Sequence, residues 1–215
     1  MGTPPLQNRV TPFGELLATP ERGLLLGNRG GRFHDPATRA LRTRRWASKH
    51  WICCVLAFKG WKREVWKTGY TEVFFLDEVT ALAAGHRPCC ECRRTAARGF
   101  QAALLAAGMT PLSLDAIDTR LDAERRDGRA RRLHRRPVSE LPDGAMIALG
   151  ADAFALRGGT ILPWTPTGYR TPLPRPAGLV DVLTPPLALA ALAGGYAPLW
   201  HPTAPAHEGI GFSAL

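Results

Sequence analysis

Cysteines are the residues whose type and spacing point most directly to chemistry in this chain. Cys89 and Cys92 stand three positions apart in the segment HRPCCECRR, residues 86–94. Two thiolates with this spacing in a tight turn can converge on one tetrahedral ion, and structural zinc sites use such pairs. The spacing therefore predicts half of a zinc site, with Cys90 pointing outward between the two ligands.

Two further cysteines are candidates for the rest of the site. Cys53 and Cys54 are adjacent in the apolar run 51–58, which we expect to be a strand. Successive strand residues point to opposite faces, so at most one of the two can reach a given ion. Cys54 is the candidate third ligand. The alternative is that both thiols are buried, because free cysteines in apolar strands commonly pack as small hydrophobic side chains.

The elements before the cysteine pair should fix its position. Residues 72–76, EVFFL, have the β-branched and aromatic composition of a strand. Asp77 can cap a helix over 78–84, and Gly85 can end it. Pro88 restricts the backbone immediately before Cys89. Strand, helix and turn are thus expected to deliver the two thiols to one place.

Arginine dominates the charge of the chain. The formal net charge is +10 and the isoelectric point is near 10.1. Such a balance favours a polyanionic partner, and the guanidinium group binds phosphate oxygens through two hydrogen bonds. We expect this partner to be nucleic acid, and a solvated basic surface without one is the alternative. The candidate contacts are Arg42, Arg45, Arg87, Arg93, Arg94, Arg98, Arg129, Arg131, Arg132, Arg135 and Arg136.

Hydrophobic periodicity, together with the Gly and Pro residues that end helices and strands, assigns these arginines to several expected elements. The expected elements are a basic helix over 36–49, a β-hairpin from 51–58 and 63–66, and amphipathic helices over 95–107 and 113–126. Positive charge at the start of the helix over 95–107 opposes the helix dipole, so we interpret Arg93, Arg94 and Arg98 as a functional basic patch. The stretch 125–137 is expected to be a connector or a loop that orders on nucleic acid.

An eight-residue pattern recurs along the chain. Residues 81–88 are ALAAGHRP and residues 191–198 are ALAGGYAP, each after a predicted strand. This suggests a duplicated strand–helix module, although Ala-rich helices that end in Gly can also arise by chance. We predict an α+β fold with two small strand-rich modules over 1–108 and 141–215, the second degenerate, joined by a helix and an Arg-rich connector over 109–140.

The glycine-rich segment 27–35, GNRGGRFHD, offers a different chemistry. Its backbone could form a nest for an anion, with His34 and Asp35 available for proton transfer. On this basis, the alternative to a DNA-binding protein is a nucleic-acid-processing enzyme that uses these two residues. A non-catalytic structural or interaction protein is the third hypothesis.

The first residues, MGTPPLQNRV, lack the apolar core of a signal peptide, and no apolar run approaches the length of a membrane span. The five cysteines are an odd number and include two adjacent pairs, which favours free thiols or metal ligands over disulfides. We therefore expect a cytoplasmic protein with no membrane partner.

Residues 74–94, FFLDEVTALAAGHRPCCECRR, resemble the N-terminal zinc module of the bacterial Ada DNA alkylation-repair protein, and the likeness extends over residues 51–94. Cys89 and Cys92 match the downstream pair of that family's four zinc-binding cysteines. The upstream pair, which includes the acceptor of a methyl group from a DNA phosphotriester, has no counterpart, because residues 60–67 contain no cysteine. The resemblance implies zinc, DNA binding and a role in DNA repair or defence, with Cys54, His50 or His86 completing the ligands.

Overall fold

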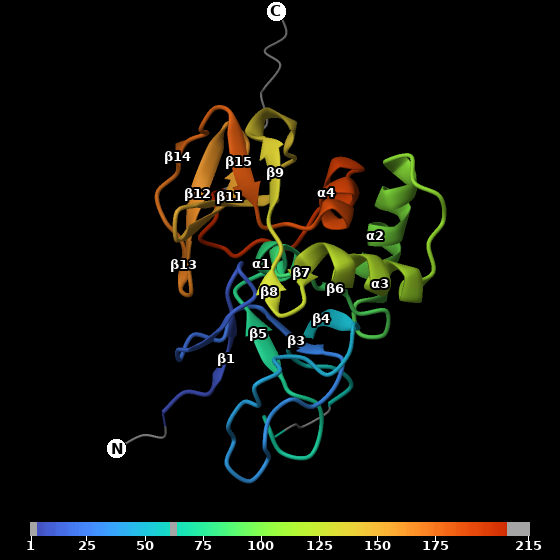
Figure 1. Ribbon diagram of the computed structural model, residues 1–215, viewed down its shortest axis with the longest axis vertical. Helices are drawn as coiled ribbons and strands as arrows, with labels where there is room; N and C mark the ends of the chain where they lie inside the picture. The colour runs from blue at the N-terminus through green and yellow to red at the C-terminus, as the bar shows by residue number, and fades with distance from the viewer. Residues whose placement is uncertain (1–3, 61–63, 206–215) are drawn as a thin grey trace, which may run out of the picture.

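The structure is a computed structural model, and it describes residues 4–60 and 64–205. Two large β-sheets, a separate two-stranded hairpin and a layer of helices form the α+β fold that the sequence predicts (Figure 1). The short helix α1 (Glu78–Ala83) lies between the two sheets, and the longer helices pack to one side of it.

The N-terminal sheet positions the cysteines. It has the order β2-β1-β5-β3-β4-β6 and consists of β1 (Gln7–Val10), β2 (Leu16–Ala18), β3 (Leu25–Arg29), β4 (Trp51–Val55), β5 (Val73–Phe75) and β6 (Arg87–Pro88). β3 pairs antiparallel with β4 and β5, whereas β6 pairs parallel with β4 and places Pro88 opposite Cys53. This last pairing brings the segment that enters the Cys89 turn beside the strand that carries Cys54.

The second sheet is built from antiparallel pairs. Its order is β13-β12-β11-β10-β15-β9, with β14 pairing β12, and its strands are β9 (His134–Pro137), β10 (Met146–Leu149), β11 (Asp152–Arg157), β12 (Thr160–Thr165), β13 (Gly168–Tyr169), β14 (Leu173–Pro174) and β15 (Leu179–Val182). The arginine-rich stretch 125–137 is ordered, because its last part is β9, the edge strand of this sheet. It forms the hairpin β7 (Arg126–Asp127) and β8 (Ala130–Arg131) and then β9, in place of the expected connector.

The helical layer contains α2 (Arg94–Ala106), α3 (Leu114–Arg125) and α4 (Pro186–Ala193), and a 3-10 turn, η1, covers Val138–Glu140. The predicted cap at Asp77 is confirmed, because its side chain accepts a hydrogen bond from Thr80 N. The side chain of Ser113 caps α3 in the same way and accepts a hydrogen bond from Ala116 N. These oxygens satisfy N–H groups that have no partner inside the helix.

All six residues of α1 are buried. Leu82 packs in the cluster formed by α2, α3 and α4, whereas Val79 and Ala83 pack against the second sheet and Ala81 packs against the N-terminal sheet. A helix of this length is unstable alone, because few hydrogen bonds offset the cost of nucleation. Tertiary packing on all sides therefore holds α1 in place.

The recurring pattern of residues 81–88 and 191–198 marks the end of a helix. In both copies the N–H of the glycine bonds back to a leucine carbonyl, and the next N–H bonds to the carbonyl five residues earlier. Residues 105–111, LAAGMTP, end α2 with the same bonds, and all three glycines have positive φ. This is the Schellman arrangement, in which Gly adopts the left-handed conformation without strain. The likeness thus follows from helix termination, and duplication is not shown.

Two predicted elements are wrong. Residues 36–49 form turns instead of a helix, with Arg39 at a φ of 54°. This stretch contains five basic and no acidic residues, so their mutual repulsion disfavours a helix. Instead, the carboxylate of Asp35 accepts hydrogen bonds from Ala37 N and Thr38 N and stabilises a turn.

The expected hairpin from 51–58 and 63–66 is also wrong, because β4 pairs with β3 and β6 instead. Residues 61–63 lie outside the described part of the chain. Trp66 is buried, and its backbone N and indole Nε1 bond to the side chain and the carbonyl of Glu72. Burial of this large ring fixes the segment as a loop over the sheet.

Candidate metal centre

Three cysteines converge at the edge of the N-terminal sheet. Cys54 comes from β4, Cys89 follows β6, and Cys92 precedes α2. Their Sγ atoms all lie within 4.8 Å of one another. Three thiolates at this separation can bind one tetrahedral ion, as the sequence predicts for Cys89 and Cys92 with Cys54 as the third ligand.

Cys53 lies on the opposite face of the strand. It is fully buried in the core of the N-terminal sheet, and Arg93 Nη1 approaches its Sγ at 3.1 Å. Burial raises the pKa of its thiol to about 12. The prediction that only one of the two adjacent cysteines reaches the ion site is therefore confirmed by the geometry, and Cys90 is exposed, as expected.

Backbone N–H groups point at the sulfur atoms. Glu91 N lies 3.4 Å from Cys89 Sγ, and Cys89 N donates to Cys53 O at 2.9 Å, which ties the turn to β4. Hydrogen bonds from the Cys54 thiol lower the pKa of Cys89 to about 5 and also lower the pKa of Cys92, while they raise the pKa of Cys54. The lowered pKa values shift Cys89 and Cys92 toward the thiolate form that metal binding requires.

Two buried ion pairs support the turn. Arg93 makes two 2.7 Å hydrogen bonds to the carboxylate of Glu78, and Arg87 makes bonds of 2.7 and 2.8 Å to the carboxylate of Asp118. The Arg93 side chain is 10% exposed and that of Arg87 is 7% exposed. These bidentate pairs hold both ends of the cysteine segment, so we assign Arg87 and Arg93 a positioning role.

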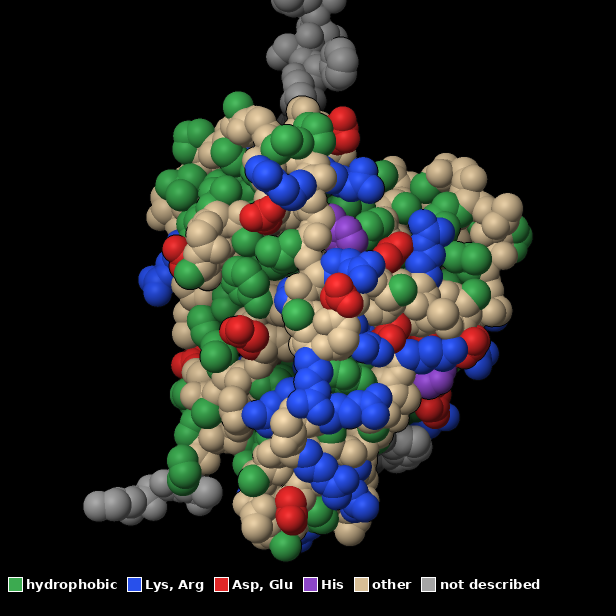
Figure 2. Space-filling view, viewed as in Figure 1, with side chains coloured by type: hydrophobic (Ala, Val, Ile, Leu, Met, Phe, Trp, Pro, Cys, Tyr) green, Lys and Arg blue, Asp and Glu red, His purple; other side chains and the backbone are tan. Residues whose placement is uncertain are grey.

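The other predicted nucleic-acid contacts are divided between interior and surface. Arg131 donates to the carbonyls of Ala83 and Leu183 and so links α1 to the second sheet, and Arg45 is half-buried. The exposed ones are Arg42, Arg94, Arg98, Arg129, Arg132, Arg135 and Arg136. Figure 2 shows Lys and Arg side chains gathered across the lower half of one face, over the loops of the N-terminal sheet and α3.

The histidines that the sequence offers lie elsewhere. His50 Nδ1 pairs with Asp118 Oδ2 at 2.7 Å, and His86 is fully buried against the rings of Trp51 and Phe75. Neither belongs to the group of converging ligands among the described residues. Burial holds the pKa of His86 well below its usual value, so this ring is neutral.

His34 and Asp35 do not form an open acid–base pair. The ring of His34 is fully buried and stacks on Trp66, with Thr71 Oγ1 at 2.8 Å and Lys67 O at 3.2 Å from its two nitrogens. The Asp35 carboxylate is occupied by the backbone N–H groups of Ala37 and Thr38. We therefore leave both His34 and Asp35 out of the candidate site.

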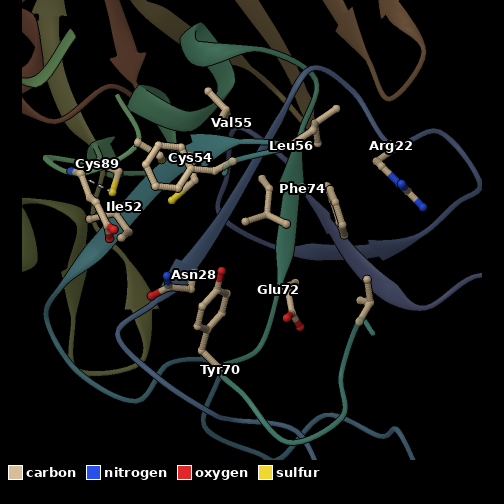
Figure 3. Close-up of a pocket in the computed structure, with 15 residues that line it drawn as sticks. Arg22, Asn28, Ile52, Cys54, Val55, Leu56, Tyr70, Glu72, Phe74 and Cys89 are labelled. Atoms are coloured by element: carbon tan, nitrogen blue, oxygen red, sulfur yellow. Dashed lines mark hydrogen bonds between the residues drawn. The ribbon is translucent and has the colours of Figure 1, made fainter. Parts of the chain in front are cut away.

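A cleft lies directly against the three thiols (Figure 3). Its volume is about 900 Å³, including the part open to solvent. Polar and aromatic side chains from β3, β5 and the loop before β5 line it together with the thiols. They include Asn28, Tyr70, Glu72 and Phe74, with Glu91 near the cysteines and Arg22 away from them. A metal ion held by the thiols would therefore border a space that can admit a ligand.

The sequence predicts Asp77 as a helix cap but does not reveal the other partners of Asp77 and Glu78. Asp77 Oδ2 accepts hydrogen bonds from Tyr169 Oη and His201 N, and Glu78 accepts bonds from Tyr196 Oη and Leu199 N besides those of Arg93. The one visible signal is a pair of adjacent acids at the start of a short helix that is mostly apolar. The partners Tyr169, Tyr196, Leu199 and His201 lie more than 90 positions away, and local patterns do not reveal such contacts.

Comparisons with protein-family models, curated proteins and solved structures find no match to this chain. Among the helices that the structure describes, none combines the length and the apolar character needed to cross a bilayer. The geometry of the thiol site and its surroundings is therefore the basis on which a function can be assigned.

Proposed function

We propose that this protein is a zinc-containing DNA-binding protein, in which Cys54, Cys89 and Cys92 hold the ion and exposed arginines contact the phosphate backbone. The observation that carries the proposal is the convergence of three Sγ atoms within 4.8 Å at the end of a turn fixed by hydrogen bonds. Thiolate ligands suit zinc, and three of them leave a fourth position of a tetrahedron for water or a substrate.

The distribution of charge supports DNA as the partner. Arg94 and Arg98 are exposed on α2, which starts two residues after Cys92. A second exposed group follows α3 and continues along β9. Guanidinium groups on such a surface would neutralise phosphates and release counterions.

The resemblance to the Ada zinc module supports a role in DNA repair or defence. We do not extend the proposal to methyl transfer from a phosphotriester, because the cysteine that accepts the methyl group in that family has no counterpart between residues 60 and 67.

Metal content tests the first part of the proposal. Protein purified without added metal should contain about one zinc per chain, and Cys54→Ser, Cys89→Ser and Cys92→Ser should each lose most of it. Cys90→Ser is the matched control, because this cysteine is exposed in the same turn and should leave the zinc in place. Native protein without zinc, or equal loss in the control, would contradict the assignment.

Salt dependence tests the second part. The affinity for a DNA duplex, measured by fluorescence anisotropy, should fall steeply with salt, with a log–log slope of about −0.9 for each phosphate contact. The double substitution Arg94→Ala with Arg98→Ala should make that slope less steep, by an amount that corresponds to about two phosphate contacts. Arg120→Ala, an exposed arginine of α3 that pairs with Glu124, is the control. Affinity that does not respond to salt would remove the electrostatic argument.

A further inference from the structure

The cleft at the thiol centre continues into a second cleft of about 910 Å³, including its solvent-open part. Arg22, Val65 and Phe74 line both, so the two form one channel that we call the nucleotide cleft. Figure 3 shows its first part, with Cys54 and Cys89 at one side and Arg22 at the other. Without the space open to solvent, the two parts measure about 210 and 460 Å³, so the second lies within the range of about 300–1,000 Å³ that is usual for a small-molecule site and the first is smaller.

The end away from the cysteines is basic. Arg9, Arg22, Arg39 and Lys67 line it, and Glu64 is the one acidic residue of its lining in the described part of the chain. The guanidinium carbons of Arg9 and Arg22 lie 5.0 and 5.3 Å from the centre of the Phe74 ring. The Phe74 ring lies beside both cations, and Arg9 also donates to the carbonyls of Glu21 and Pro20. A cluster of guanidinium groups held in this way suits binding of a phosphate group.

The middle of the cleft suits a planar heterocycle. Tyr70 projects into it and lies between Asn28 and Glu72 in the view of Figure 3. Asn28 Oδ1 accepts a hydrogen bond from Gly30 N, so its amide offers the Nδ2 donors to a ligand, and the Glu72 carboxylate offers an acceptor. An aromatic face beside one donor and one acceptor is the combination that binds the edge of an unpaired base.

We propose that the nucleotide cleft binds one unpaired nucleotide, with its base beside Tyr70 and its edge toward the three cysteines, and with its phosphate among Arg9, Arg22 and Arg39. The inference rests on the proposed function insofar as the nucleotide belongs to a DNA strand. The same chemistry fits a free nucleoside monophosphate, and the experiment separates the two sources.

The first measurement compares strands. The zinc-loaded full chain is titrated with a fluorescein-labelled single strand of about 12 nucleotides and with the matching duplex, at one salt concentration. The single strand should bind about tenfold more tightly, because a base in a duplex must leave its stack before it can enter the cleft. Unlabelled cytidine or adenosine monophosphate should displace it.

The second measurement uses matched variants. Arg22→Ala should weaken single-strand binding about tenfold, and Tyr70→Ala should do the same through lost stacking. Arg120→Ala also removes one exposed charge, but Arg120 pairs with Glu124 and lies outside the cleft, so its effect should stay within about threefold. Arg22 is exposed, so its variant keeps the test valid if Tyr70→Ala does not fold.

The outcomes separate the two proposals. Equal affinity for single strand and duplex, together with equal effects of Arg22→Ala and Arg120→Ala, would overturn the nucleotide cleft and leave DNA binding intact. Binding of the monophosphates without binding of either strand would overturn the proposed function and support the cleft as a site for free nucleotides. Binding of the single strand with displacement by a monophosphate supports both.

The orientation of the base has its own readout. In the cobalt-substituted protein, cytidine monophosphate should change the visible absorption of the thiolate-bound ion, because the edge of the base alters the surroundings of that ion. An unchanged spectrum at saturating monophosphate would overturn the placement of the base edge toward the cysteines.

Discussion

The ends of α1 and α4 share a backbone arrangement but lead into different segments. After Pro88 the chain enters the turn of Cys89 and Cys92, whose thiols face the nucleotide cleft. After Pro198 the chain turns back onto α1, where Leu199 N donates to Glu78 Oε2 and Glu78 N donates to Leu199 O. The same helix end thus leads into the cysteine segment in one place and into a segment that supports α1 in the other.

Breaking the link between the two segments should have the largest effect. Glu78→Ala leaves Arg93 buried without its carboxylate and removes acceptors from Tyr196 and Leu199. Loss of one partner of a buried pair costs about 3–5 kcal/mol, so we expect that decrease in the free energy of unfolding, measured in urea. The exposed pair of Lys67 and Glu64 is the control, and Glu64→Ala should cost less than about 1 kcal/mol. Equal effects of the two substitutions would contradict this role of Glu78.

Removing the metal should affect the cysteine segment but not the segment after α4. A chelator should lower the stability of the zinc-loaded protein by about 2.7 kcal/mol when the free zinc had been at 100 times Kd. Hydrogen exchange should then accelerate in residues 89–93 but change little in 196–201, because only the first segment carries ligands. The measurement is amide exchange by mass spectrometry, and uniform acceleration in both segments would contradict the comparison.

Alanine at the glycines that end α1 and α4 should give the smallest difference in stability between the two regions. Gly85 and Gly195 have φ values of 83° and 94°, so either substitution forces a left-handed alanine at a cost of about 1–2 kcal/mol. A Cβ at Gly85 would also meet Arg125 Cδ at 2.6 Å, whereas one at Gly195 meets nothing within 4 Å. Gly85→Ala should therefore cost about 1 kcal/mol more, measured by thermal unfolding. Equal costs would mean that the Arg125 side chain moves aside freely.

The sequence predicted the local parts of this structure well. The α+β class, the capped helix after Asp77 and the opposite facing of Cys53 and Cys54 follow from periodicity, capping and strand alternation, which are short-range rules. The approach of Cys54 to the Cys89 turn depends on the pairing of β4 with β6, which these rules do not give. Residues 36–49 were predicted as a helix because their apolar positions fit one, but charge repulsion and the Asp35 turn decide their conformation. The partners of Glu78 and the lining of the nucleotide cleft depend on contacts between distant segments, which no local pattern contains.

The burial of α1 on all sides has a consequence for how the protein folds. Val79, Ala81 and Leu82 each belong to a different core cluster, so opening either sheet exposes apolar surface of the same short helix. We therefore expect the two sheets to unfold together in one cooperative transition, even though they lie in separate parts of the chain. The amides of α1 should exchange only through global unfolding, which makes this six-residue segment the slowest-exchanging part of the protein.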